Sequence, residues 1–227
     1  MSLLFKANVV KIQVLSVSRL MSTSNIHADD VIRRKMLEKI IRVDHAGELG
    51  ASYIYRGKSK SLAKLKKKAN INHCILIGQM AILKNNQRAA PLIQEMWDQE
   101  KEHLHKFEQL LITYNVKPTI FQPLWKAAGF TLGAGCALLG EAGAMACTVA
   151  VEDLVTKHYD DQVKEMLEHD PSLDKDLIAT IKQFRDDEQN HLDMGLAHGA
   201  ENAPLYNLLT KVINYGCRNA IWISEKI

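Results

Sequence analysis

Apolar residues recur at spacings of three and four along most of the chain, whereas the alternation typical of β-strands is nearly absent. This period matches one face of an α-helix and predicts an all-α protein. Prolines and glycines are sparse and mark the expected breaks. The predicted helices span residues 30–57 continuing through 79–87, then 91–115, 122–169 with an interruption near Gly140, 172–200 and 204–224.

The most apolar stretch runs from Phe130 to Val151 and is interrupted by Glu141. The apolar runs on either side are too short for a membrane-spanning helix, which needs about 20 residues. Two readings remain open for this stretch, a buried core helix or a surface that dips into one face of a bilayer. The last predicted helix raises the same question through its own apolar residues, Leu205, Leu208, Leu209, Val212, Ile213 and Ile221.

The formal charge of +3 is distributed unevenly along the chain. Residues 1–24 carry three basic residues and no acid, and residues 58–78 carry six lysines and no acid. The remainder of the chain is therefore acidic. This distribution removes the reason to expect a nucleic-acid partner.

The N-terminal segment, residues 1–24, is basic, contains serines and is loosely amphipathic. This combination is typical of a mitochondrial presequence. A disordered or merely helical N-terminus is the alternative. The predicted organisation is thus a presequence at 1–24 followed by one domain at 25–227.

Two segments share the pattern D-x-E-x-x-H-L: DQEKEHL at 98–104 and DDEQNHL at 186–192. A glutamate and a histidine three residues apart lie on the same helical face, so a carboxylate and an imidazole can reach one metal ion. The two pairs are Glu100 with His103 and Glu188 with His191.

A third pair with the same spacing, Glu102 with His105, shows how weak one such pair is as evidence. It has no counterpart in the second segment, where Asn190 stands at the position equivalent to Glu102. The internal repeat therefore selects Glu100 and His103.

A glutamate in apolar, small-residue surroundings precedes each of these segments: Glu48 in RVDHAGELGA and Glu152 in CTVAVEDLV. Such a setting is costly for a carboxylate unless something compensates its charge. Each glutamate is followed seven residues later, on the same helical face, by a tyrosine, Tyr55 or Tyr159. The chain thus repeats the order Glu, Tyr, ExxH twice.

One glutamate from each of two helices and an ExxH pair from each of two others form the site of ferritin-like di-iron carboxylate bundles. Four carboxylates offset the charge of two divalent ions, and oxygen ligands with one imidazole per metal favour iron or manganese over zinc. The predicted fold is therefore an all-α, ferritin-like four-helix bundle with a di-iron centre and extra apolar, membrane-facing helices. Nearby Asp44, His45 and His158 are predicted to be hydrogen-bonding neighbours or surface residues rather than ligands. The predicted metal ligands are Glu48, Glu100, His103, Glu152, Glu188 and His191.

At these residues the chain resembles the ubiquinone-biosynthesis hydroxylases, the demethoxyubiquinone monooxygenase family. The resemblance covers nearly all of the predicted mature chain, residues 25–227, and implies that Glu100 and Glu188 bridge the two metals. The matching stretches are RVDHAGE (42–48), GQMAIL (78–83), MWDQEKEHL (96–104), GFTLGAGCALLG (129–140), GAMACTVAVE (143–152) and the block from FRDDE through GCRNAI (184–221).

The resemblance implies an enzyme that uses two irons, dioxygen and electrons from NADH to hydroxylate the ring of demethoxyubiquinol, the penultimate step of ubiquinone biosynthesis. Tyr159, beside His158, is a candidate for the electron route to the metals, with a core tyrosine as the alternative. The polyprenyl tail of the substrate needs an apolar entrance, for which residues 130–139 are the candidate. The family also implies peripheral attachment to the matrix side of the mitochondrial inner membrane and a lipid-binding protein partner.

Residues 58–78 depart from the family, whose members run directly from a tyrosine-x-glycine like Tyr55-Arg56-Gly57 into QMAIL. Possible codons at Gly57-Lys58-Ser59 and Ile77-Gly78 supply splice-donor and splice-acceptor sequences and would regenerate a glycine in frame. We therefore hypothesise a retained intron. A basic insertion that loops out between two half-helices is the alternative.

Two rival functions remain open at this stage. Another ferritin-like oxidase or peroxidase would explain the six ligands equally well, but not the apolar segment or the presequence. A non-catalytic, membrane-associated scaffold of the ubiquinone-biosynthesis complex would explain the apolar faces, but not the duplicated buried carboxylates.

Overall fold

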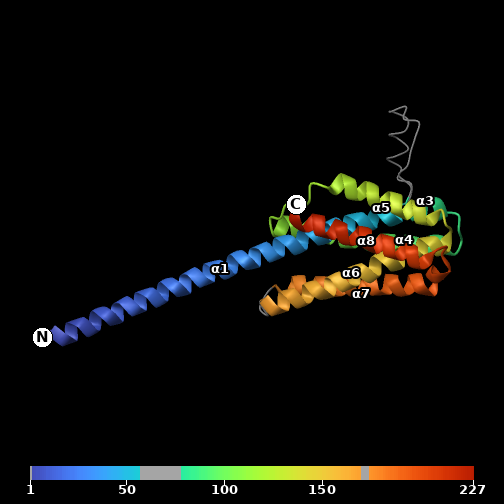
Figure 1. The fold of residues 1–227 in the computed structure, drawn as a ribbon. Coiled ribbons are helices and arrows are strands. Elements are labelled where there is room, and N and C mark those ends of the chain that lie inside the picture. Colours follow the sequence, from blue (N-terminus) through green and yellow to red (C-terminus); the bar gives the residue numbers. More distant parts are fainter. Residues whose placement is uncertain (1, 57–77, 170–173) are drawn as a thin grey trace, which may run out of the picture. The chain divides into compact units, whose positions relative to one another are not determined.

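The computed structural model describes residues 2–56, 78–169 and 174–227, with side chains from residue 29 onward, and the regular elements in these ranges are all helical. This confirms the predicted all-α class. The chain divides into two compact units, residues 1–39 and 40–227, and the second contains every element after α1 (Figure 1). The elements are α1 (Ser2–Tyr55), α3 (Gln79–Leu83), α4 (Ala89–Thr113), α5 (Gln122–Ala137), α6 (Glu141–His169), α7 (Lys175–Ala197), the short 3-10 helix η1 (Ala200–Asn202) and α8 (Tyr206–Lys226).

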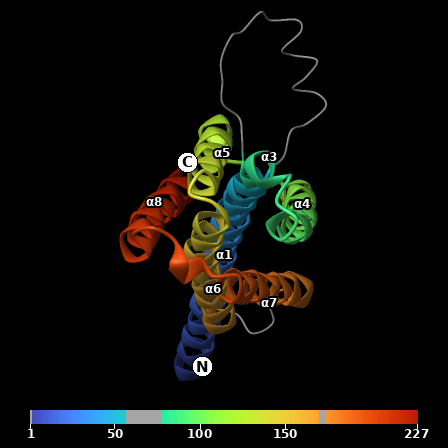
Figure 2. The ribbon, with the colours of Figure 1, turned by 90° about the vertical axis from the view of Figure 1, so that its right-hand side faces the viewer.

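Within residues 40–227, α4, α6, α7 and the C-terminal part of α1 surround a common interior. Figure 2, which looks along these helices, shows α4 and α7 on one side of α6 and α8 on the other. Large apolar side chains fill this interior, and burial of each one contributes about 1.5–3 kcal/mol. The fully buried apolar side chains include Ile40, Ile41, Ile93, Met96, Phe107, Met145, Met166 and Leu177.

Helix α5 packs closely against α1 through glycines. A Cβ atom at Gly129 would collide with the carbonyl oxygen of Gly50, and one at Gly133 would collide with that of Ile54. Glycine at these two positions therefore lets the two backbones approach directly.

Capping groups explain several helix boundaries. The interruption predicted near Gly140 is confirmed, because Gly140 has a φ of 86° between α5 and α6. The Asn86 side chain accepts hydrogen bonds from the backbone N–H groups of Arg88 and Ala89, which starts α4 at Ala89. Asp174 caps α7 in the same way, so that helix begins at Lys175 rather than near residue 172.

Two other predicted helix spans differ from the structure by more residues. Helix α1 begins at Ser2 rather than near residue 30 and ends at Tyr55, and the helix predicted at 79–87 ends at Leu83, because the turn at Asn86 follows. The predicted insertion at 58–78 lies outside the described residues except for Gly78. The predicted presequence coincides with the first turns of α1 and stays a prediction.

Within the described residues, none of the helices combines the length and apolar character needed to cross a bilayer. The stretch predicted to be too short for a spanning helix is divided between α5 and α6. Phe130 and Ala144–Cys147 are buried in the core, whereas Leu138 and Leu139 are exposed.

Candidate metal centre

The six predicted ligands lie together in the interior formed by α1, α4, α6 and α7. Their carboxylate and imidazole atoms form two groups, and within each group the atoms lie within 4.8 Å of one another. All six residues are buried. One group is Glu48, Glu100, His103 and Glu188, and the other is Glu100, Glu152, Glu188 and His191.

Glu100 and Glu188 belong to both groups, which is the arrangement required of carboxylates that bridge two ions. Glu188 contacts both imidazoles, with 3.0 Å from its Oε1 to His103 Nδ1 and 2.8 Å from its Oε2 to His191 Nδ1. The Nδ1 atom of each imidazole therefore faces the carboxylates.

The protonation of the cluster shows that it needs positive charge. Burial, reinforced by repulsion from Glu188, raises the pKa of both Glu100 and Glu152 well above the ordinary value. Burial disfavours the charged imidazole of His103, but its hydrogen bond with Glu188 and the nearby Glu48 carboxylate, 3.6 Å away, raise its pKa to about 12. Burial likewise disfavours ionised Glu188, yet hydrogen bonds with His103 and His191 lower its pKa to about 2. Protons thus supply the compensation that cations would supply.

The donor set fits a pair of divalent ions. Four buried carboxylate oxygens at the centre have no hydrogen-bond partner, namely Glu48 Oε2, both oxygens of Glu100, and Glu152 Oε2. Buried oxygens of this kind are costly unless they accept a hydrogen bond or bind a cation. Four carboxylates and two imidazoles favour iron or manganese.

Two buried tyrosines donate hydrogen bonds to the cluster crosswise. Tyr55 donates to Glu152 Oε1 at 2.7 Å, and Tyr159 donates to Glu48 Oε1. The sequence places each tyrosine near its own glutamate, but α1 and α6 run antiparallel, so each reaches the glutamate of the opposite helix. One oxygen of each glutamate is thereby occupied, and the other, Oε2, remains without a partner.

Sequence reasoning missed the partners of the outer imidazole nitrogens. His191 Nε2 lies 2.6 Å from Gln99 Oε1, and His103 Nε2 lies 3.2 Å from Asp187 Oδ2. Gln99 and Asp187 occupy the variable position of the D-x-E repeat. That position could have been noticed, because antiparallel helices place the residue before each glutamate opposite the histidine of the other helix.

The three neighbours predicted not to be ligands belong to neither of the two groups among the described residues. Gln162 Nε2 donates to Asp44 Oδ1 at 2.7 Å and lies 2.9 Å from His158 Nε2. Burial raises the pKa of Asp44 and lowers that of His45. Asp44, Gln162 and His158 thus form a polar network beside the centre.

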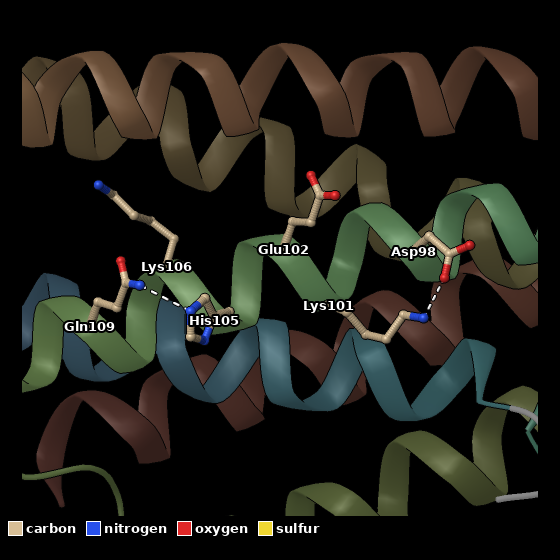
Figure 3. A pocket seen from close by; sticks show the side chains of 6 residues that line it. All are labelled: Asp98, Lys101, Glu102, His105, Lys106 and Gln109. Atoms are coloured by element: carbon tan, nitrogen blue, oxygen red, sulfur yellow. Dashed lines mark hydrogen bonds and ion pairs between the residues drawn. The ribbon is translucent and has the colours of Figure 1, made fainter.

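The third ExxH pair lies on the surface, as the repeat predicts. Figure 3 shows a shallow pocket whose six lining residues all belong to α4, with Glu102 and His105 pointing away from each other. Both are exposed, and His105 is hydrogen-bonded to Gln109 rather than to Glu102.

An apolar cavity of about 330 Å³ reaches the centre from the side of α1, α5, α6 and α8. Its wall includes Glu48, Glu152 and Glu188 but neither His103 nor His191. Gly47, Gly50 and Gly216 also line it, and a Cβ atom at any of them would meet no atom within 4 Å. Asp44, His158 and Tyr159 supply further polar groups on a wall that is otherwise mostly apolar.

A shallower groove on the surface of α5 shares Ala128 and Leu132 with this cavity. Leu124, Ala127, Thr131 and Gly135 line it, with Leu209 from α8. Leu132 is the only residue of the predicted entrance, 130–139, that lines the cavity as described, whereas Gly135 and Cys136 line the groove.

An all-helical interior with two buried groups of three glutamates and one histidine, sharing two of the glutamates, has the character of a di-iron carboxylate protein. Over residues 35–75 and 71–224, the chain matches the family described as Ubiquinone biosynthesis protein COQ7, and it belongs to that family.

Relatives from animals, fungi and bacteria support this assignment. The chain is 49% identical to the NADPH-dependent 3-demethoxyubiquinone 3-hydroxylase, mitochondrial, of Mus musculus over 87% of this chain and 81% of the mouse protein. It is 38% identical to the 5-demethoxyubiquinone hydroxylase, mitochondrial, of Saccharomyces cerevisiae over 84% and 78% of the two chains. It is also 38% identical to the 3-demethoxyubiquinol 3-hydroxylase of Rhodospirillum rubrum over 85% and 79%. The mouse enzyme is named for NADPH, whereas NADH is the reductant expected from the family resemblance.

Proposed function

We propose that this protein is a mitochondrial demethoxyubiquinol hydroxylase that inserts one oxygen atom from dioxygen into the quinol ring during ubiquinone biosynthesis. The observation that carries the proposal is that an apolar cavity is lined by glutamates of the two carboxylate–imidazole groups. Membership of the family and the names of its relatives supply the substrate class.

The cavity and the groove suit the two parts of such a substrate. A ring placed in the cavity would lie against Glu48, Glu152 and Glu188, with Gly47 and Gly216 leaving space for its substituents. The polyprenyl tail would leave past Ala128 and Leu132 into the groove between α5 and α8. This path includes Thr131, Leu132, Gly135 and Cys136 of the entrance predicted at 130–139.

The six buried residues would hold two irons, with Glu100 and Glu188 bridging them. A bound pair of reduced irons supplies the activation of dioxygen, whereby one oxygen atom enters the ring and the other leaves as water. The hydrogen bonds from Tyr55 and Tyr159 hold Glu152 and Glu48 so that their Oε2 atoms point toward the centre. The apolar cavity wall keeps water away from the reacting ring.

The two electrons that balance the reaction come from a reduced nicotinamide dinucleotide. Because the mouse relative is named NADPH-dependent, NADPH takes the place of the NADH expected from the resemblance. Tyr159 lines the cavity and also donates to Glu48, so we assign it to the electron route between the cavity and the centre.

The proposed location is the matrix side of the mitochondrial inner membrane, reached through a presequence at residues 1–24. Exposed apolar side chains on α5 and α8, such as Leu124, Leu208 and Trp222, would contact lipid or a lipid-binding protein partner. Such contacts would let the polyprenyl substrate enter without crossing water.

A single-turnover experiment tests the proposal. The full chain would be loaded anaerobically with Fe(II), supplied with NADPH and a short-tailed demethoxyquinol, and exposed to ¹⁸O₂. Mass spectrometry should find one ¹⁸O atom in the hydroxylated ring. Parallel reactions with NADH would compare the two reductants.

His105→Ala is the matched control, because it changes an ExxH histidine on the exposed face of α4. It should retain full turnover, whereas His103→Ala should not. A wild-type protein that binds two irons but leaves the ring unlabelled would contradict the substrate assignment and favour a ferritin-like oxidase or a scaffold.

A further inference from the structure

The outer nitrogen of each histidine at the centre faces a different kind of acceptor. Asp187 Oδ2, a carboxyl oxygen, lies 3.2 Å from His103 Nε2. Gln99 Oε1, an amide oxygen, lies 2.6 Å from His191 Nε2. The two contacts occupy equivalent places in the antiparallel pair α4 and α7. They differ only in the acceptor group, which is a carboxylate in one and an amide in the other.

Both acceptors fix the same tautomer of the imidazole. An amide or carboxylate oxygen accepts a hydrogen bond, so Nε2 carries a proton, and a metal that displaces the proton from Nδ1 would meet the lone pair of that nitrogen. The Nδ1 atoms are the ones that face the carboxylates, at 3.0 Å for His103 and 2.8 Å for His191 from Glu188. A hydrogen-bond partner on the outer nitrogen therefore presents the inner nitrogen to a metal.

The ring of His103 is also held by packing. Its centroid lies 4.0 Å from that of Phe184, at an interplanar angle of 31°. Asp187 follows Phe184 on the same helix by three residues, so α7 supplies both the stacked ring and the acceptor. Neither Phe184 nor Asp187 lines the apolar cavity.

The two acceptors differ in charge. A carboxylate makes a stronger, charge-assisted hydrogen bond than an amide and makes the imidazole a better electron donor to a metal. The Asp187 side chain is 28% exposed, so water can relieve part of the cost of its charge. Gln99 gives its histidine the same orientation without a charge.

We propose that Gln99 and Asp187 are positioning residues for the two histidines, and that their difference makes the metal position at His103 bind its ion more tightly than the position at His191. The proposal rests on the proposed di-iron function and extends it to the order in which the two positions fill. The proposed difference between the two metal positions arises from Gln99 and Asp187 and leaves the six proposed ligands the same.

Stepwise metal binding to the full chain tests this inference. Co(II) would be titrated anaerobically into metal-free protein and followed by its visible absorption, and ⁵⁷Fe(II) protein would be studied by Mössbauer spectroscopy. The wild type should show two binding steps and two distinct iron signals. Asp187→Asn should weaken the first step by about 10-fold, the lower end of the effect of losing such a partner, and leave the second unchanged.

The reciprocal variant, Gln99→Glu, should strengthen the weaker step and bring the two iron signals closer together. Asp186→Asn is the matched control, because it makes the same chemical change one residue away on an exposed side chain paired with Arg185. Thermal unfolding of the metal-free variants would show that each still folds.

Two equal binding steps in the wild type, or the same shift from Asp186→Asn as from Asp187→Asn, would overturn the inference. Failure of the proposed function is recognised separately. Wild-type protein that fills two unequal positions but does not hydroxylate the quinol ring would support the inference and contradict the substrate assignment, whereas protein that binds no metal would overturn both.

Discussion

The two sides of the carboxylate cluster are built differently. On the side of α1 and α6, glutamates receive hydrogen bonds from tyrosines, and the apolar cavity reaches Glu48 and Glu152. On the side of α4 and α7, histidines are backed by Gln99 and Asp187 and contribute nothing to the cavity wall. The side of α1 and α6 is open to an apolar ligand, whereas from α4 and α7, among the described residues, only Glu188 lines the cavity.

This difference separates two tasks. In the proposed enzyme, the imidazole side would fix the position and electron donation of the metals. Its hydrogen bonds to Gln99 and Asp187 would be lost if this side also had to admit a hydrophobic ring. The glutamate side can open because each carboxylate keeps one oxygen tied to a tyrosine. Changes on the two sides should therefore affect different measurements.

The largest effect is expected where the two sides meet. Glu188→Ala removes the carboxylate that contacts both histidines and belongs to both ligand groups. Iron affinity should fall by well over 100-fold, since loss of an outer partner alone costs about 10–100-fold, and turnover should be undetectable. Iron content after anaerobic reconstitution is the measurement. Glu102→Ala, on the exposed face of α4, should bind iron as the wild type does, and retention of two irons by Glu188→Ala would contradict the site.

Metal binding should depend steeply on pH. Burial raises the pKa values of Glu100 and Glu152 in the metal-free protein, and the pKa of His103 is raised to about 12, so at neutral pH a metal must displace at least the proton of His103. Affinity should therefore rise with pH and fall on acidification, by about tenfold per pH unit for each proton released. Titration calorimetry in buffers of different ionisation heat would count the protons. Zero release at pH 7 would be incompatible with the raised pKa values.

Filling the cavity should impair only the open side. Gly216→Leu adds a side chain where a Cβ meets no atom within 4 Å, so the protein should fold and bind two irons. Its kcat/KM for a short-tailed quinol should fall by roughly 10–100-fold, because the ring loses its space. Gly135→Leu, in the groove rather than the cavity, should impair only long-tailed substrates. Equal losses with short and long tails for both variants would argue against separate places for ring and tail.

The two tyrosines allow a matched comparison across the open side. Tyr55→Phe and Tyr159→Phe each remove one hydrogen bond to a buried glutamate, so each should lower the free energy of unfolding by about 1–2 kcal/mol. Tyr159 lines the cavity and Tyr55 does not. Only Tyr159→Phe should slow reduction of the iron centre in stopped-flow experiments. Identical reduction rates would leave Tyr159 as a core tyrosine.

The smallest effect is expected from removing residues 58–78. A Cβ at Gly78 would lie 2.6 Å from the carbonyl oxygen of Arg56, so the chain returns to the point where α1 ends. Deletion should preserve iron binding and raise the free energy of unfolding by about 1–2 kcal/mol through lower loop-closure entropy.

Loss of iron binding on this deletion would instead support a structural insertion. Sequencing of the complementary DNA decides the origin of the segment, since an abundant message with these codons would contradict a retained intron.

The helical class and the six clustered residues could be predicted because both depend on local spacing. The 3.6-residue period defines the helices, and the internal repeat distinguishes Glu100 from Glu102. The ends of the helices were harder to predict. The start of α4, for example, depends on hydrogen bonds from the backbone N–H groups of Arg88 and Ala89 to Asn86, which the period of apolar residues does not encode.

Contacts between helices were the part that local spacing could not supply. The crosswise tyrosines and the contacts of Gln99 and Asp187 require the antiparallel register of α1 with α6 and of α4 with α7. The cavity depends on where α5 and α8 lie, which the apolar character of their sequences leaves open between core and membrane surface.

The crosswise contacts have a consequence for the ancestry of the site. Exchanging α1 and α4 with α6 and α7 carries Glu48 onto Glu152, Tyr55 onto Tyr159, and each ExxH pair onto the other. A single helical hairpin with one glutamate, one tyrosine and one ExxH pair therefore contains every group that the centre needs, and two copies related by a twofold axis would complete it. The arrangement is that expected from a duplicated hairpin, whose two halves differ at the outer histidine contacts, where one half supplies the carboxylate of Asp187 and the other the amide of Gln99.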